Sequence, residues 1–97
     1  STTTQTEIIS NPYMFNLNVT PNPITDFARI NYTLPNAGKT SIKLFNASGR
    51  LVETLLDNTM NAGTYTMTIH AHKLAKGIYF LKYEANGEKA EVKLIVQ

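Results

Sequence analysis

Hydrophobic and polar residues alternate with a period of two along much of this chain, and that alternation limits the folds open to it. It is clear in residues 28–34, 64–69 and 89–94, and a shorter copy covers residues 41–44. A strand with one packed face and one wet face has this pattern, which is typical of antiparallel sheets. The sequence therefore predicts an all-β protein.

Glycine marks the turns between these segments. Successive glycines are separated by 11, 14, 14 and 10 residues, a spacing that suits short strands joined by tight turns. Asn86-Gly87 is a pair that favours the type I′ turn of a two-residue hairpin, and it predicts a hairpin between the last two strands. The glycines are Gly38, Gly49, Gly63, Gly77 and Gly87.

The pattern predicts an immunoglobulin-like antiparallel β-sandwich of about seven strands, without the Cys pair and Trp of antibody domains. Charged residues are only 16 %, and there are thirteen Thr residues, a composition that suits strands more than exposed helices. Residues 78–83 are apolar on both faces except for Lys82, so this strand is expected in the middle of a sheet. One turn of helix is expected in residues 71–76. The expected strands are 14–20, 27–34, 40–46, 51–56, 64–70, 78–84 and 89–96.

Length and charge narrow the range of functions. The 97 residues make one small domain; we expect residues 1–12 to be the remnant of a linker and residues 13–97 to be the domain. A net charge of +2 with only two arginines gives no face for nucleic acid. The absence of Cys excludes disulfides, thiolate metal sites and a Cys nucleophile. No apolar run reaches the ~18 residues of a membrane span.

No constellation of side chains predicts an enzyme or a bound cofactor. His70 and His72 are spaced to share one strand face, but no carboxylate lies nearby in sequence to complete a metal site, so we interpret them as polar residues at a strand end. The carboxylates are scattered, and a filled sandwich offers no cleft for paired acid–base chemistry. Exposed Tyr79 and Tyr83, or Phe45, would form a sugar-binding face, unless the second sheet or a loop covers them.

Six short motifs follow one another in an order that resembles the C-terminal sorting domain of the type IX (Por) secretion system. The resemblance covers about residues 20–97. The motif residues with an expected structural role are Pro21, Asn22, Pro23, Gly49, Arg50, Gly63, Gly77 and Tyr79. In sequence order the motifs are Pro21-Asn22-Pro23, Tyr32-Thr33-Leu34-Pro35, Gly49-Arg50-Leu51-Val52, Ala62-Gly63-Thr64-Tyr65, Leu74-Ala75-Lys76-Gly77-Ile78-Tyr79, and Lys93-Leu94-Ile95-Val96-Gln97.

This resemblance implies a non-enzymatic sorting signal on a larger cargo protein of a Gram-negative bacterium, mostly of the Bacteroidetes. Such domains fold in the periplasm and are recognised by an outer-membrane translocon and its shuttle protein. A sortase-like peptidase usually removes them in the linker, and the cargo is secreted or stays at the cell surface. The resemblance places the cleavage region in or beside residues 1–12. It places the recognition element in Lys89 to Gln97, with Lys89, Lys93, Leu94, Ile95, Val96 and Gln97 as its candidate residues.

A last strand at the edge of a sheet suits such a role, because it offers unpaired backbone N–H and C=O groups to a partner. Lys89 and Lys93 on its polar face would limit edge-strand self-association and would pair with an acidic receptor surface. Two other functions stay open at this point. One is an immunoglobulin-like module that binds carbohydrate or protein, and the other is a structural spacer of a secreted multidomain protein.

Overall fold

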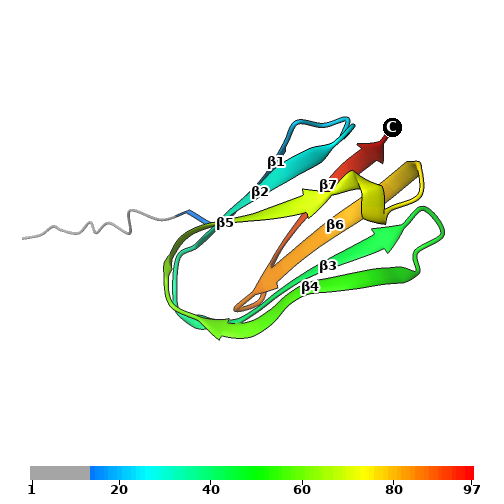
Figure 1. The fold of residues 1–97 in the computed structure, drawn as a ribbon. Helices are drawn as coiled ribbons and strands as arrows, with labels where there is room; N and C mark the ends of the chain where they lie inside the picture. Colours follow the sequence, from blue (N-terminus) through cyan, green and yellow to red (C-terminus); the bar gives the residue numbers. More distant parts are fainter. Residues whose placement is uncertain (1–13) are drawn as a thin grey trace, which may run out of the picture.

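A computed structural model, which describes residues 14–97, shows a sandwich of two antiparallel sheets (Figure 1). The prediction of an immunoglobulin-like sandwich of seven strands is confirmed. One sheet has three strands in the order β1-β2-β5, and the other has four in the order β4-β3-β6-β7. The strands are β1 (Asn16–Thr20), β2 (Phe27–Leu34), β3 (Gly38–Asn46), β4 (Leu51–Met60), β5 (Gly63–His70), β6 (Gly77–Ala85) and β7 (Glu88–Val96).

Five of the predicted strands differ from the structure by one or two residues at an end, and β4 differs by more. The first strand begins at Asn16 and not at residue 14, and β4 continues four residues beyond the predicted end at residue 56. The register of β4 against β3 shifts twice, so that Val52 and Leu55 are extra residues without a partner on β3. Such β-bulges break the period-two pattern of an edge strand. The predicted helical turn is a short 3-10 helix, η2 (Ala71–Lys73). The predicted linker, residues 1–12, lies outside the described residues.

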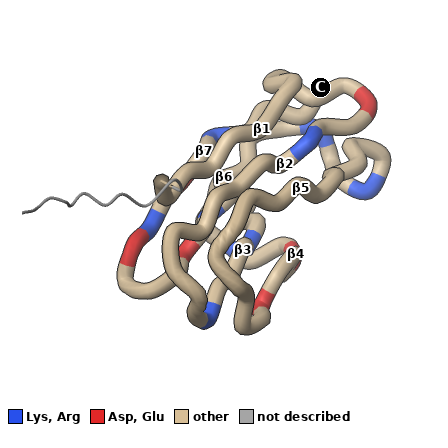
Figure 2. Tube along the Cα trace, turned by 90° about the vertical axis from the view of Figure 1, so that its left-hand side faces the viewer, with Lys and Arg blue, Asp and Glu red and all other residues tan. Residues whose placement is uncertain are grey.

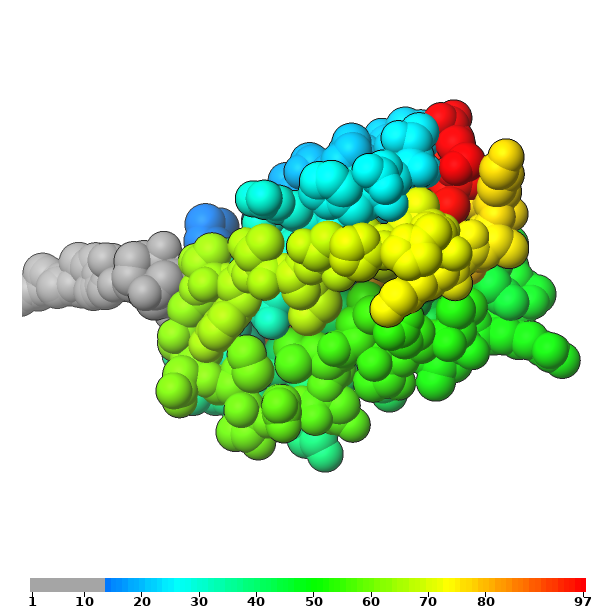
Figure 3. Space-filling view, in the orientation of Figure 1, coloured from blue at the N-terminus to red at the C-terminus, as the bar shows by residue number. Residues whose placement is uncertain are grey.

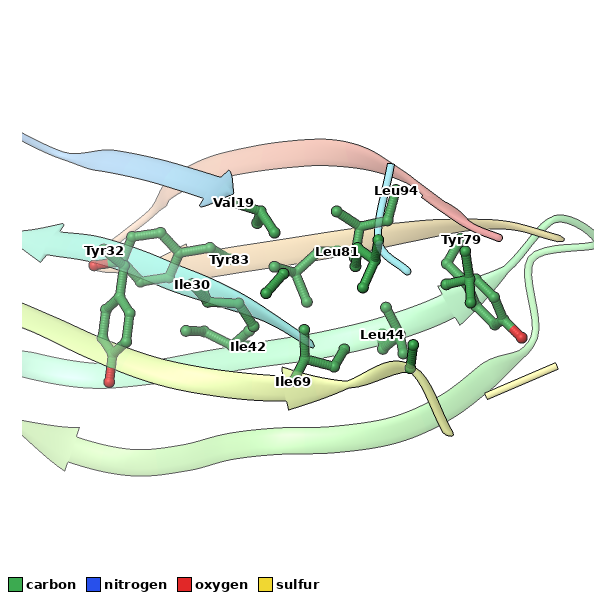
Figure 4. Close-up of a cluster of buried hydrophobic side chains, with 14 of the residues drawn as sticks. Val19, Ile30, Tyr32, Ile42, Leu44, Ile69, Tyr79, Leu81, Tyr83 and Leu94 are labelled. Carbon is green, nitrogen blue, oxygen red and sulfur yellow. The ribbon is translucent and has the colours of Figure 1, made fainter. Parts of the chain in front are cut away.

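The core is formed by the inward-facing side chains of both sheets. Ile30 and Leu34 of β2 meet Ile42 and Leu44 of β3, and all four side chains are fully buried. Figure 4 shows Leu81 in the middle of this cluster, with Tyr32 and Tyr83 at one end and Tyr79 at the other. In each alternating strand, the apolar side chains therefore face the opposite sheet, and the polar side chains between them lie on the outer faces of the sandwich.

Tyrosines close both ends of the core. The rings of Phe15 and Tyr83 stack with their centroids 4.5 Å apart, and Tyr32 meets Tyr83 edge to face at 5.4 Å. At the opposite end, the hydroxyl of Tyr79 donates to the carbonyl oxygen of Ala75 at 2.6 Å. Tyr79 lies near the start of β6. In immunoglobulin-like sandwiches, a tyrosine near the start of the corresponding strand often donates its hydroxyl hydrogen bond to the backbone a few residues upstream. It fixes the turn through Gly77 into β6.

Candidate functional site

The candidate recognition element is β7, which lies at one edge of the four-stranded sheet. It forms a hairpin with β6 through Asn86 and Gly87, whose φ angles of 52° and 82° are those of the predicted type I′ turn. The side chains of β7 alternate: Leu94 and Val96 are buried in the core, whereas Lys93 is exposed on the outer face. The prediction that β6 runs in the middle of the sheet is also confirmed.

The register of the hairpin sets which backbone groups of β7 point away from the sheet. In a two-residue hairpin the pair that closes the turn, here Ala85 and Glu88, exchanges hydrogen bonds. Every second residue after Glu88 then bonds to β6. The backbone N–H and C=O groups of the residues between them point outward, and these residues are Lys89, Glu91, Lys93, Ile95 and Gln97.

A segment that follows β1 covers the C-terminal half of this edge. The side-chain amide of Asn22 donates to the carbonyl oxygen of Lys93 at 2.8 Å and accepts from the N–H of Ile95 at 3.1 Å. The backbone N–H of Ile24 donates to the carbonyl oxygen of Ile95 at 2.7 Å, and the carbonyl oxygen of Ile24 accepts from the N–H of Gln97 at 2.9 Å. We call Asn22 and Ile24 the clasp. Their four hydrogen bonds replace those of a neighbouring strand.

The clasp corrects the expectation of an unpaired edge. Along this edge of β7, the described residues 14–97 provide no hydrogen-bond partner for the outward N–H and C=O groups of Lys89 and Glu91 or for the N–H of Lys93. The C-terminal part of the edge is already used inside the domain. Figure 3 shows the C-terminal residues, in red, packed beside the segment that joins β1 to β2, in cyan.

The six candidate recognition residues therefore divide into two groups. Leu94 and Val96 are buried at 0 % and 3 % exposure, so they serve packing and are closed to a partner in the folded domain. Lys89, Lys93, Ile95 and Gln97 have exposed side chains. In Figure 2, β7 lies beside β1 on one side of the sandwich, with charged residues gathered at its start.

The other motif residues shape turns. Gly49 has a φ of 87°, in the left-handed region, and lies in the turn that joins β3 to β4. Next to it, the backbone N–H of Arg50 donates to the side-chain oxygen of Asn46 at 3.0 Å. Gly63 and Gly77 also have positive φ angles, 156° and 147°, where β5 and β6 begin. Glycine adopts such conformations without the steric penalty of a Cβ atom.

Tyr79 and Tyr83 do not form the exposed sugar-binding face that was considered from the sequence. Their side chains are 7 % and 0 % exposed, and both point between the sheets (Figure 4). Phe45 is on the outer face, where it is half-buried beneath Lys82, whose Nζ lies 4.7 Å from the ring centroid. The second sheet covers the two tyrosines, which is one of the two outcomes that the sequence left open, and they are not exposed to bind a sugar.

The two histidines lie together near the end of β5. The ring centroids of His70 and His72 are 5.6 Å apart. His70 ends β5 but His72 lies in η2, so the two side chains do not share one face of a strand. Across the described part of the chain, no group of three or more His, Cys, Asp or Glu side chains is placed to hold a metal ion. The same residues contain no helix long and apolar enough to span a membrane.

Sequence reasoning missed the clasp and the stacking of Phe15 on Tyr83. The signal for the clasp was an amide residue held between Pro21 and Pro23 and followed by a lone apolar residue, Ile24, which is fully buried. From the sequence alone, Pro21, Asn22 and Pro23 have only an expected structural role, and nothing in the local pattern connects them with β7, about seventy residues later.

Comparison with protein families decides what kind of domain this is. Residues 18–97 match the model of the family described as the secretion system C-terminal sorting domain. The chain belongs to this family. The match extends from β1 through the end of β7, so this sorting domain includes the clasp and both sheets. A search of curated proteins gives no match.

Membership of this family assigns the coarse function. A sorting domain of the type IX secretion system is carried by a cargo protein and directs its export across the outer membrane, to a secreted or cell-surface state. The domain therefore interacts with secretion machinery.

Proposed function

We propose that the folded domain is recognised by the outer-membrane translocon and its shuttle protein through β7, and that it performs no reaction itself. The observation that carries the proposal is the position of β7 in a domain of this family: an edge strand whose outer-face side chains and N-terminal backbone groups are open to a partner. Such an edge accepts a partner by backbone pairing and by side-chain contact.

Each exposed residue of β7 has a distinct part in this contact. Lys89 and Lys93 give two positive charges on the outer face, and they form no ion pair within the described residues 14–97. Ile95, 38 % exposed, adds an apolar contact next to Lys93. The outward backbone groups of Lys89 and Glu91, which have no partner among the described residues, allow a short strand to pair there.

The rest of the export route follows the family. A sortase-like peptidase removes the domain by cleavage in or near residues 1–12, after the cargo in front of the domain has crossed the outer membrane. Edge-strand self-association is limited by the clasp and by the lysines of β7, both of which are recognised ways to protect a sheet edge. The proposed acceptor is therefore the secretion machinery.

Removal of Val92–Gln97 from a cargo that carries this domain tests the proposal. We expect the cargo to accumulate in the periplasm, and normal surface display would contradict the proposal. Because this deletion also removes the buried Leu94 and Val96, a second variant leaves the core intact. Lys89→Glu with Lys93→Glu reverses the two exposed charges and should lower export, whereas Lys39→Glu, exposed on β3, is the matched control.

A further inference from the structure

An apolar patch occupies one end of the outer face of the four-stranded sheet. Leu51, Phe45 and Phe80 are directly paired in register across β4, β3 and β6, so their side chains share this face. Two residues further along the strands, Ile78 of β6 pairs with Ile95 of β7. We call these five residues the outer patch: Phe45, Leu51, Ile78, Phe80 and Ile95.

Most of the outer patch is open to solvent. Leu51 is 53 % exposed, Ile78 is 40 % exposed and Ile95 is 38 % exposed, whereas Phe45 and Phe80 are half-buried against their neighbours. On the outer face of the other sheet, the alternating positions of β5 hold Thr64, Thr66 and Thr68. The outer face of the three-stranded sheet is therefore polar along β5, so the fold does not require apolar side chains on an outer face. The contiguous apolar residues on the outer face of the four-stranded sheet indicate an interaction surface.

Lysines of β3, β6 and β7 border the outer patch. Lys93 is paired in register with Phe80, and Lys43 is directly opposite Lys82, which covers the ring of Phe45. None of these three lysines forms an ion pair with another described residue in 14–97. Three carboxylates share this face: Glu91 is paired in register with Lys82, whereas Asp57 and Glu84 are paired with Ser41, further from the apolar end. Beside the outer patch, the three lysines Lys43, Lys82 and Lys93 stand against the single carboxylate of Glu91, so this end of the face has a net positive charge.

The structure of β7 connects this patch with sorting. Leu94 and Val96 are buried in the core, and the clasp occupies the outward backbone groups of Ile95 and the N–H of Gln97. The side chains of Lys93 and Ile95 are then the parts of the C-terminal motif that face outward on the sheet. Both belong to the region of the outer patch. A partner that reads these two side chains also meets Phe80, Ile78 and, beyond them, Phe45 and Leu51.

We infer that the outer patch is a docking surface for a protein of the secretion machinery that presents apolar side chains bordered by carboxylates. This inference rests on the proposed function and extends the recognition element from β7 to residues of β3, β4 and β6. The positive border selects an acidic partner, because charge complementarity favours the right encounter and like charges oppose the wrong one. A second copy of this chain is disfavoured, since packing two outer patches together brings Lys43, Lys82 and Lys93 against the same three lysines.

The main test removes apolar surface without touching β7. Leu51→Thr with Phe80→Thr keeps strand-favouring residues at two outer-face positions, and the matched control is Phe27→Thr, at an exposed phenylalanine (44 %) on β2 of the other sheet. The readout is export of a full-length cargo that carries the domain. We expect the double variant to lower export about tenfold, a loss typical of one well-buried interface contact. The control should export normally.

A second pair of variants tests the charge of the partner. Lys43→Glu with Lys82→Glu reverses the border, whereas Lys39→Glu changes an exposed lysine at the far end of β3. We expect only the first to reduce export. Thermal melting of the 97-residue chain checks that each variant folds, and a folded double variant with reduced export supports the docking surface.

The outcomes separate this inference from the proposed function. If deletion of Val92–Gln97 blocks export but Leu51→Thr with Phe80→Thr does not, the outer patch is not part of the docking surface and the proposed function stands. If neither change affects export, the proposed function fails and the inference fails with it. Sedimentation that shows a dimer abolished by Leu51→Thr and Phe80→Thr, or binding to phosphatidylglycerol vesicles lost in the same variant with export unchanged, would overturn the inference and assign the patch to a second copy or to a lipid surface.

Discussion

The hydroxyl of Tyr83 donates a hydrogen bond of 2.9 Å to the carbonyl oxygen of Thr33, and this bond joins β6 to β2 across the sandwich. Burial is the main cause that raises the pKa of Tyr83 to about 12, and the nearby Tyr32, Glu88 and Tyr65 act in the same direction. The neutral phenol is therefore the form that the folded domain holds. Burial also raises the pKa of Tyr32 above its ordinary value.

These shifts predict a loss of stability in alkali. Because the pKa of Tyr83 is about 12 in the fold and about 10 in the unfolded chain, its contribution is complete below pH 10 and is lost as the pH rises toward 12. The shift corresponds to about 2–3 kcal/mol of unfolding free energy. Urea unfolding of the 97-residue chain at a series of pH values from 8 to 12 measures it.

Tyr83→Phe is the matched variant for this measurement. It should be less stable than the wild type by about 1 kcal/mol at pH 8, because the hydrogen bond to Thr33 is lost. Its stability should fall less steeply above pH 10, with the remaining slope due to Tyr32. An alkaline slope identical to that of the wild type would show that Tyr83 is not the responsible group.

The clasp predicts a second effect on stability. Asn22→Ala removes the two hydrogen bonds to Lys93 and Ile95, so we expect a loss of about 1–3 kcal/mol and faster amide hydrogen exchange at Ile95. Asn22→Asp keeps an acceptor for the N–H of Ile95 but places a carboxylate beside the carbonyl oxygen of Lys93, so it should not restore stability. Asn18→Ala, at an exposed position of β1, is the control.

Loss of the clasp should also lengthen the open edge of β7. With the side chain of Asn22 gone, the carbonyl oxygen of Lys93 and the N–H of Ile95 join the outward groups of Lys89 and Glu91. Longer unpaired edges favour pairing between chains. Sedimentation velocity should therefore show more self-association for Asn22→Ala than for Asn18→Ala. Exchange at Ile95 and sedimentation that both match the wild type would contradict a protective role for the clasp.

The fold was largely predictable because its signals are local. Six of the seven strands lie within about two residues of their predicted bounds, since alternation and glycine turns are both read from neighbouring residues. The exception is β4, where bulges at Val52 and Leu55 disrupt the alternation. The clasp was not predictable in this way. In the clasp, the side chain of Asn22 takes the place of a backbone hydrogen-bond partner for β7. Asn22 and Ile95 are far apart in sequence and meet only in the folded domain, so no local pattern predicts their contact.

The sequence left open whether Tyr79 and Tyr83 are exposed or covered, for a different reason. A central strand that is apolar on both faces does not reveal by alternation which phase points into the core. Lys82 was the usable signal, because a lysine that must reach water places Ile78 and Phe80, its neighbours in the same phase, on the outer face. The tyrosines then belong to the inner face. The same reasoning applies to β7. Lys93 must reach water, so its neighbours in the chain alternate around it, and Leu94 and Val96 face the core.

The contact of Gly38 with Asn86 gives a prediction that a double-mutant cycle can test. A Cβ at residue 38 would overlap the side-chain amide of Asn86, which donates from Nδ2 to the carbonyl oxygen of Asn36 at 3.0 Å. Gly38→Ala should displace this amide and cost about 1–2 kcal/mol of unfolding free energy, measured by urea denaturation. With Asn86→Gly, which keeps the positive φ of the turn, the same Ala should cost much less. Gly49→Ala has open space but a φ of 87°, so its cost should be unchanged by Asn86→Gly. Equal costs of Gly38→Ala in both backgrounds would show that the two residues are not coupled.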